Sequence, residues 1–235
     1  MLRPRIYPEM MGKALVLEAE PFITMVDDDE PWAEGLFFTV CVGLLVGIAR
    51  VIGGLLTTAT MPPTDVMLEA ILRGMRQAGL LDGGGVLSIS ETIVRQDWHF
   101  LATMLGVAGG WLRLYILVAA PFLLVVQWLL VGGVGYVAAR QMGGRGSFSQ
   151  TLGATALIAA PSALYVVSIA PFASVSGLLL FAWGLLITYR ALEVAQDLPW
   201  QKAAVAAVIP LLVQLLILLP ASIWFLHWLL QGGAV

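Results

Sequence analysis

The sequence predicts an all-α integral membrane protein, a bundle of five transmembrane helices with one or two amphipathic helices at the membrane surface. Two observations predict this fold class. First, 60% of the residues are hydrophobic, 11% are charged, and the mean hydropathy is +0.92, values far outside the range of a soluble domain. Second, residues 114–139, 146–189 and 203–235 contain no charged side chain. Because a helix needs about 20 apolar residues to cross a bilayer core about 30 Å thick, these stretches provide one, two and one crossings.

The first crossing is predicted over residues 35–59 and contains one charge, Arg50. A central arginine costs about 2.5–3.5 kcal/mol on insertion scales, and the apolar residues of this stretch outweigh that cost. Arg50 lies about 22 Å along the helix from Gly35. We therefore interpret its side chain as reaching the far headgroups, with a buried functional cation as the alternative.

Residues 1–34 are expected to form a cytoplasmic segment before the membrane domain, 35–235. Within this segment, residues 14–26 are apolar enough to rest on the inner leaflet or on a partner, but too short to span. The acidic run from Asp27 to Glu30 could chelate a divalent cation. It lacks the spaced ligand pattern of a calcium loop, however, and acids before a helix complement its dipole, which is the interpretation we favour.

Residues 61–110 are the most polar part of the membrane domain. Two amphipathic helices are predicted here, over residues 65–78 and 88–103. An apolar stripe on such a helix needs lipid headgroups, the end of the bundle or another protein to cover it. We therefore take three residues of the first helix as candidate partner contacts: Leu68, Ile71 and Leu72.

The remaining crossings are predicted over residues 111–140, 148–170 and 175–189, and from Lys202 towards the C-terminus. A tight loop between the second and third crossings supplies four further candidate contacts: Gly143, Gly144, Arg145 and Ser147. Most Lys and Arg residues of the short loops fall on the side of the N-terminus, which is therefore predicted to be cytoplasmic. The C-terminus is then outside.

Chemistry-bearing side chains are few. No enzyme constellation appears, and neither a cofactor site nor a metal site is predicted, because two histidines in the chain are too few for a closed histidine-based site. His227 is expected at a membrane interface. Gln127 and Gln214 are expected to form hydrogen bonds between helices, while Gly43 with Gly47, and Gly132 with Gly135, should let helices approach closely.

Two functional classes remain open. One is a non-enzymatic membrane scaffold or accessory subunit of a larger complex, bound to membrane lipid and to other membrane proteins or copies of itself. The other is a small transporter or channel, favoured if Arg50, Gln127 and Gln214 line one water-accessible cavity. The net charge of −3, without clustered Lys and Arg, excludes nucleic acid as a partner.

Two segments, 136–164 and 181–210, resemble the Yip1 domain family. The first reads YVAARQMGGRGSFSQTLGATALIAAPSAL and the second FAWGLLITYRALEVAQDLPWQKAAVAAVIP. The resemblance implies a small five-helix membrane protein, and eukaryotic members act in vesicle traffic with Rab-type GTPases. This chain lacks their Asp-Leu-Tyr-Gly-Pro motif, which argues against a GTPase partner. Its preference for Arg over Lys, with abundant Ala and Gly, is typical of a bacterial protein of the cytoplasmic membrane.

Overall fold

The computed structural model describes residues 4–81, 90–104, 114–171 and 173–230, and within these ranges every regular element is helical. Five segments are long and apolar enough to cross a membrane. They are α3 (Pro31–Thr60), α6 (Tyr115–Gln141), α7 (Phe148–Thr155) continued by η3 (Ala156–Ile169), α8 (Gly177–Gln196) and α9 (Trp200–Leu230). The predicted all-α, five-crossing architecture is confirmed.

Three crossings differ in detail from the sequence prediction. α3 begins at Pro31 and takes Glu34 into its first turn. The third crossing changes from α to 3₁₀ geometry at Ala156 and contains Pro161. α8 continues past the predicted end to Gln196, because Arg190 and Glu193, which suggested a loop, form an ion pair on the helix itself.

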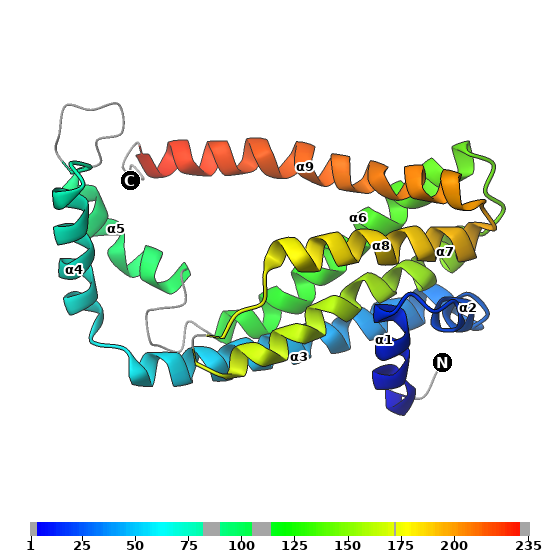
Figure 1. Ribbon diagram of the computed structural model, residues 1–235, viewed down its shortest axis with the longest axis horizontal. Helices are drawn as coiled ribbons and strands as arrows, with labels where there is room; N and C mark the ends of the chain where they lie inside the picture. Colours follow the sequence, from blue (N-terminus) through cyan, green and yellow to red (C-terminus); the bar gives the residue numbers. More distant parts are fainter. Residues whose placement is uncertain (1–3, 82–89, 105–113, 172, 231–235) are drawn as a thin grey trace.

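The spanning segments run side by side along the long axis of the molecule (Figure 1). α3 packs between η3 and α6, and the predicted glycine step lies at this contact. A methyl group added at Gly43 would lie 2.3 Å from the Cα of Pro121, and one at Gly53 would lie 1.8 Å from the carbonyl oxygen of Ser168. The two glycines therefore let the backbone of α3 lie directly against its neighbours.

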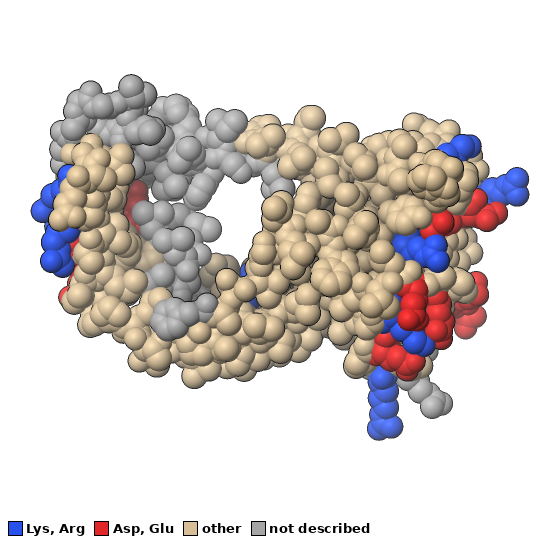
Figure 2. All heavy atoms as spheres, in the orientation of Figure 1, with Lys and Arg blue, Asp and Glu red and all other residues tan. Residues whose placement is uncertain are grey.

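Most charged side chains gather at the two ends of the molecule and leave a largely uncharged belt between them (Figure 2). The belt surface is apolar: Leu178 is 79% exposed, Leu216 is 76% and Val118 is 73%. Large apolar residues exposed at this density would be unfavourable in water, and they match the hydrocarbon of a bilayer. The chain is a multi-pass membrane protein.

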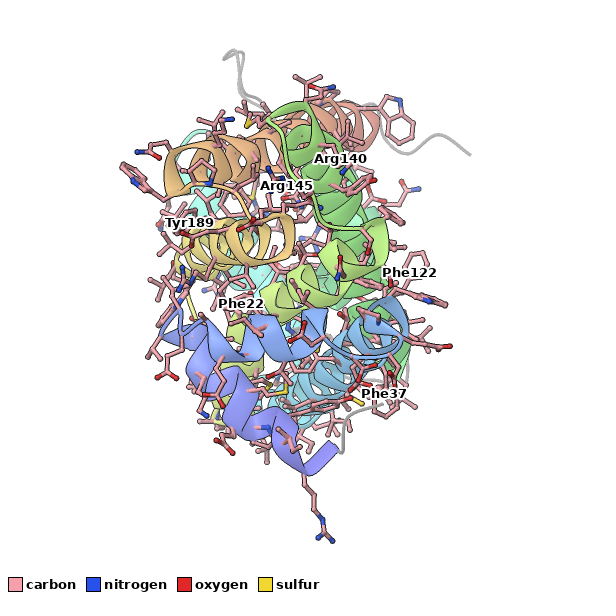
Figure 3. The ribbon with its side chains drawn as sticks, turned by 90° about the vertical axis from the view of Figure 1, so that its right-hand side faces the viewer. Phe22, Phe37, Phe122, Arg140, Arg145 and Tyr189 are labelled. Carbon is pink, nitrogen blue, oxygen red and sulfur yellow. The ribbon has the colours of Figure 1, made fainter. Side chains whose placement is uncertain are left out.

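The N-terminal segment is part of the packed structure. It forms α1 (Tyr7–Leu15) and α2 (Glu20–Val26), preceded by a single 3₁₀ turn, η1 (Pro4–Ile6). Phe22 and Met25 are fully buried, and the indole of Trp183 on α8 donates a hydrogen bond of 2.8 Å to the carbonyl oxygen of Leu15. Part of the apolar stretch expected to rest on the inner leaflet or a partner is thus buried in the chain itself, whereas Val16 and Ile23 stay exposed; the end-on view shows how this segment lies against the bundle (Figure 3).

At the other end, α4 (Thr64–Gln77) and α5 (Glu91–Met104) lie beyond the bundle (Figure 1). Both amphipathic helices were predicted, within three residues at each boundary. The two helices pack on each other. Residues 82–89, between them, lie outside the described part of the chain.

Candidate functional site

The loop between α6 and α7, which contains the four candidate contacts, packs against the end of α8. Gly143 adopts a left-handed φ of +97°, and a methyl group at Gly144 would lie 2.4 Å from Oε1 of Gln196. The backbone N–H of Arg145 donates to the carbonyl oxygen of Gln196, at 3.0 Å. Ser147 caps α7 in a reciprocal pair with Gln150. The loop therefore fixes the junction between α6, α7 and α8, and of the four candidates only Gly143, Arg145 and Ser147 remain exposed at the surface.

The three candidate partner contacts on α4 differ in their exposure to solvent. Leu72 is fully buried and Leu68 is half-buried, while Ile71 is 40% exposed. Trp98 of α5 is also buried, and its indole donates a hydrogen bond of 3.1 Å to the carbonyl oxygen of Thr64. α5 therefore lies on the stripe that seemed from the sequence to require an external partner, and Leu72 is not available to one.

Arginine and glutamate side chains connect α4 and α5. Arg76 lies 2.7 Å from Glu91, and Arg95 lies 2.7 Å from Glu69 and 2.9 Å from Glu91. Hydrogen bonds from Arg76 and then Arg95 hold the pKa of the Glu91 carboxyl below its ordinary value. Single exposed ion pairs stabilise little, but a connected group of four side chains restrains the relative position of the two helices.

The acidic run before α3 shows no metal-binding geometry. The backbone N–H of Glu30 donates to the Asp28 carboxylate at 2.9 Å, and Glu30 occupies the N-cap position of α3. Across the ranges that the structure describes, no group of three His, Cys, Asp or Glu side chains could hold a metal ion. The side chain of His227 lies outside the described residues, so its predicted interfacial position stays a prediction.

A buried pair that the sequence reasoning missed joins the N-terminal segment to the bundle. The Tyr7 hydroxyl on α1 donates a hydrogen bond to the Glu34 carboxylate on α3, and the two residues are only 6% and 1% exposed. Burial, together with this hydrogen bond, raises the pKa of Tyr7 above its ordinary value. Residues 1–34 were treated as separate from the membrane domain, and no periodic signal connects these two side chains.

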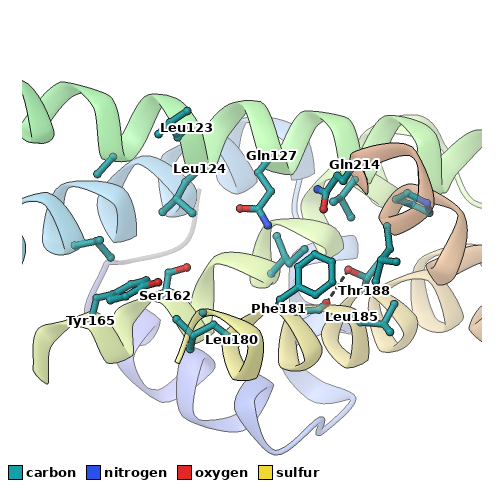
Figure 4. A pocket seen from close by; sticks show the side chains of 18 of the residues that line it. Leu123, Leu124, Gln127, Ser162, Tyr165, Leu180, Phe181, Leu185, Thr188 and Gln214 are labelled. Atoms are coloured by element: carbon teal, nitrogen blue, oxygen red, sulfur yellow. Dashed lines mark hydrogen bonds between the residues drawn. The ribbon is translucent and has the colours of Figure 1, made fainter. Parts of the chain in front are cut away.

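Within the apolar belt, both polar and apolar side chains surround a cavity of about 290 Å³. Residues from α3, η3, α6, α8 and α9 line it. Its polar lining consists of Arg50, Gln127, Ser162, Tyr165, Thr188 and Gln214. In the close-up view, the amides of Gln127 and Gln214 extend into this space from α6 and α9 (Figure 4).

Arg50 is an exposed residue, so the structure does not bury it as the alternative sequence interpretation expected. Its guanidinium carbon lies 4.2 Å from the centroid of the Tyr165 ring, in a cation–π contact. Arg50 also lines the cavity together with Gln127 and Gln214. These contacts support a cavity-facing cation rather than a free interfacial anchor.

The two glutamines do not form the predicted bonds between helices. Within the described part of the chain, neither side-chain amide has a hydrogen-bond partner in the protein, and both are half-buried at the cavity. The sequence correctly marked these residues as unusual for a membrane interior. It could not show that three separate helices bring Arg50, Gln127 and Gln214 to one cavity.

Comparison with known proteins supports the resemblance. The family model of the Yip1 domain matches residues 15–222, which is most of the chain. No curated protein and no solved structure shows a significant match to the sequence. The match begins at Leu15, the last residue of α1, and ends within α9, so it includes α2, the glycine loop and residues of all five crossings. The chain therefore belongs to the Yip1 domain family.

Proposed function

We propose that this protein is a non-enzymatic scaffold or accessory subunit of a larger complex in a bacterial cytoplasmic membrane. The observation that carries the proposal is the α4–α5 pair, which lies beyond the bundle (Figure 1) and is held together by its own ion pairs and buried Trp98. A rigid element that extends from the spans can bind another protein without rearrangement of the bundle.

The packing of the bundle at the α1–α2 end also favours a scaffold over a channel. Between the cavity and that end, small and apolar residues from α6, α8, α9 and the turn between α8 and α9 form a packed cluster. Its buried members are Ala138, Ala139, Leu192, Leu198, Ala203, Ala206 and Ala207. A methyl group at Gly135 would already lie 3.3 Å from Leu192. A layer of buried small and apolar side chains opposes a continuous aqueous path at this level of the bundle.

Polar substitutions on the exposed edge of α4 test the scaffold directly. Val66 is 49% exposed and Ile71 is 40% exposed, so Val66→Ser with Ile71→Ser removes apolar surface without entering the α4–α5 interface. Truncating a central contact costs about 1 kcal/mol or more, about fivefold in affinity. Proteins that remain attached after gentle detergent extraction should fall about fivefold or more, measured by quantitative mass spectrometry.

The matched control for this experiment is Leu216→Ser, an exposed apolar residue of the belt. It should leave the attached proteins unchanged. Leu72→Ser, in contrast, changes a fully buried side chain of α4 and should loosen the packing of α4 on α5. Equal recovery of the same proteins by wild type and by the Val66 and Ile71 variant would contradict the proposed docking through α4.

The proposed orientation places the N-terminus and the Gly143 loop in the cytoplasm. In a Cys41→Ala background, Ser147→Cys should therefore be shielded from a membrane-impermeant thiol reagent in intact cells. Gly74→Cys on α4 is the matched position at the opposite end, where a side chain meets open space, and it should react readily. The lost Ser147 cap costs about 1 kcal/mol, which five packed spans tolerate. Labelling of Ser147→Cys but not of Gly74→Cys would show that the orientation is opposite to the proposed one.

A small transporter is the second candidate, and the cavity is the observation that favours it, because Arg50, Gln127 and Gln214 all line it. This was the arrangement expected from the sequence for a transporter. Uptake of a polar solute into proteoliposomes, abolished by Gln127→Leu, would favour this function over the scaffold.

A further inference from the structure

The depth of the cavity in the membrane follows from the position of Arg50 on α3. With a rise of about 1.5 Å per residue, Arg50 lies about 22 Å from Gly35, so with Gly35 at the near edge of a roughly 30 Å hydrocarbon core Arg50 would lie about 8 Å inside the far edge. The headgroup region of the leaflet on the α4–α5 side is within reach of a long side chain at this depth. The guanidinium can thus meet a polar group that descends slightly from the interface.

The charge of Arg50 is not balanced within the cavity. Among the described lining residues there is no aspartate and no glutamate, and Arg50 is the one ionised side chain. The ring of Tyr165 provides a partial counter-charge only through its quadrupole. An arginine inside the apolar belt therefore favours an anionic partner from outside the chain.

The geometry around Arg50 suits a tetrahedral or planar anion. A guanidinium presents a planar set of N–H donors that binds phosphate with two parallel hydrogen bonds. Contact with Tyr165 restrains the guanidinium before any ligand arrives. The amides of Gln127 and Gln214 and the hydroxyl of Ser162 offer further donors around the same space.

The cavity is also open to the surface of the belt. Leu123 of α6 lines the cavity and is also 63% exposed. Leu124, Leu180, Phe181 and Leu211 complete the walls with apolar surface. A ligand with both an anionic group and a hydrocarbon part matches this combination, whereas a free ion would leave the apolar walls uncovered.

We propose that this cavity binds the phosphate group of an anionic membrane lipid. Arg50 holds the phosphate, Gln127 and Gln214 donate hydrogen bonds to the headgroup, and the acyl chains leave the cavity past Leu123 into the bilayer. The proposal is independent of the scaffold function, because it rests on the cavity and not on the α4–α5 pair.

Native mass spectrometry of the full-length protein in detergent tests the proposal. The protein is titrated with phosphatidylglycerol, with phosphatidylcholine of the same acyl chains, and with inorganic phosphate. Phosphatidylglycerol should bind about tenfold more tightly than phosphatidylcholine, and inorganic phosphate should bind more weakly than either lipid. Arg50→Gln should weaken phosphatidylglycerol about tenfold and remove the preference over phosphatidylcholine.

Two variants distinguish loss of the site from loss of the fold. Arg145→Gln removes an exposed arginine outside the cavity and should bind as wild type does. Gln127→Leu leaves Arg50 in place and keeps a side chain of similar size, but it removes one hydrogen-bond donor. It should weaken the binding of phosphatidylglycerol severalfold at unchanged helical content. This variant decides the outcome if Arg50→Gln does not fold. Equal binding of both lipids by the wild type, or wild-type binding by every folded variant, overturns the proposal. Tighter binding of inorganic phosphate than of phosphatidylglycerol overturns the assignment to a lipid.

Discussion

Gly43→Ala should destabilise the bundle by about 3 kcal/mol or more, the upper part of the range for an overpacked core. The added methyl group would lie 2.3 Å from the Cα and 2.9 Å from the backbone nitrogen of Pro121. Backbone atoms cannot move aside as a flexible side chain can, so α3 and α6 must separate along their contact. Unfolding of the purified protein in mixed detergent micelles, followed by circular dichroism, measures the loss.

Gly133→Ala is the matched control for this substitution. Gly133 lies on α6, and a methyl group there would meet nothing within 4 Å. Because alanine favours a helix by about 1 kcal/mol over glycine, this variant should be neutral or slightly more stable. Equal stability of the Gly43 and Gly133 variants would show that the α3–α6 contact does not depend on a missing side chain.

Trp128→Ala should cost about 3–5 kcal/mol, the usual loss for a large aromatic side chain removed from a packed core. Trp128 is fully buried, and its indole donates a hydrogen bond of 2.8 Å to the carbonyl oxygen of Leu152. The substitution therefore creates a void between α3, α6 and α7 and removes the partner of that carbonyl oxygen. The same detergent unfolding experiment applies.

Two variants separate the contributions of Trp128. Trp128→Phe retains most of the apolar volume and loses only the indole N–H, so it should cost about 1–3 kcal/mol. Trp200→Ala, at a position 61% exposed, should change stability by less than about 1 kcal/mol. A Trp128→Ala variant as stable as Trp200→Ala would mean that the α6–α7 contact adapts to the missing ring.

The crossings could be predicted from the sequence because the bilayer imposes a length and excludes charge, and both properties are visible along the chain. The contact through Gly43 was predictable for a related reason, since small residues at helical spacing indicate close helix contacts. These properties depend on residues near one another in the sequence. The family resemblance was visible for the same reason, in two continuous segments that are now included in the match over 15–222.

Features that depend on distant residues could not be predicted in this way. Tyr7 meets Glu34 only because α1 folds back on the bundle, and Leu72 is fully buried although it belongs to a helix that lies beyond the bundle. Arg50 was assigned to the headgroups on its depth alone, and its contact with Tyr165, more than a hundred residues further along the chain, has no local signal. Arg50, Gln127 and Gln214 could be recognised in the sequence as unusual for a membrane interior, but their positions around one cavity could not be predicted.

The 3₁₀ geometry of the third crossing has a consequence for the thickness of bilayer that this protein fits. Fourteen residues of η3 extend about 28 Å at a rise of about 2.0 Å, compared with about 21 Å in an α-helix. The 22 residues of α7 and η3 can therefore run alongside much of the 30-residue α3 and bring Ser168 to Gly53. A return of this segment to α geometry would shorten one side of the bundle by about 7 Å, a mismatch that a lipid bilayer resists by tilting or thinning. The 3₁₀ geometry of η3 therefore sets the length of this crossing that a bilayer must accommodate.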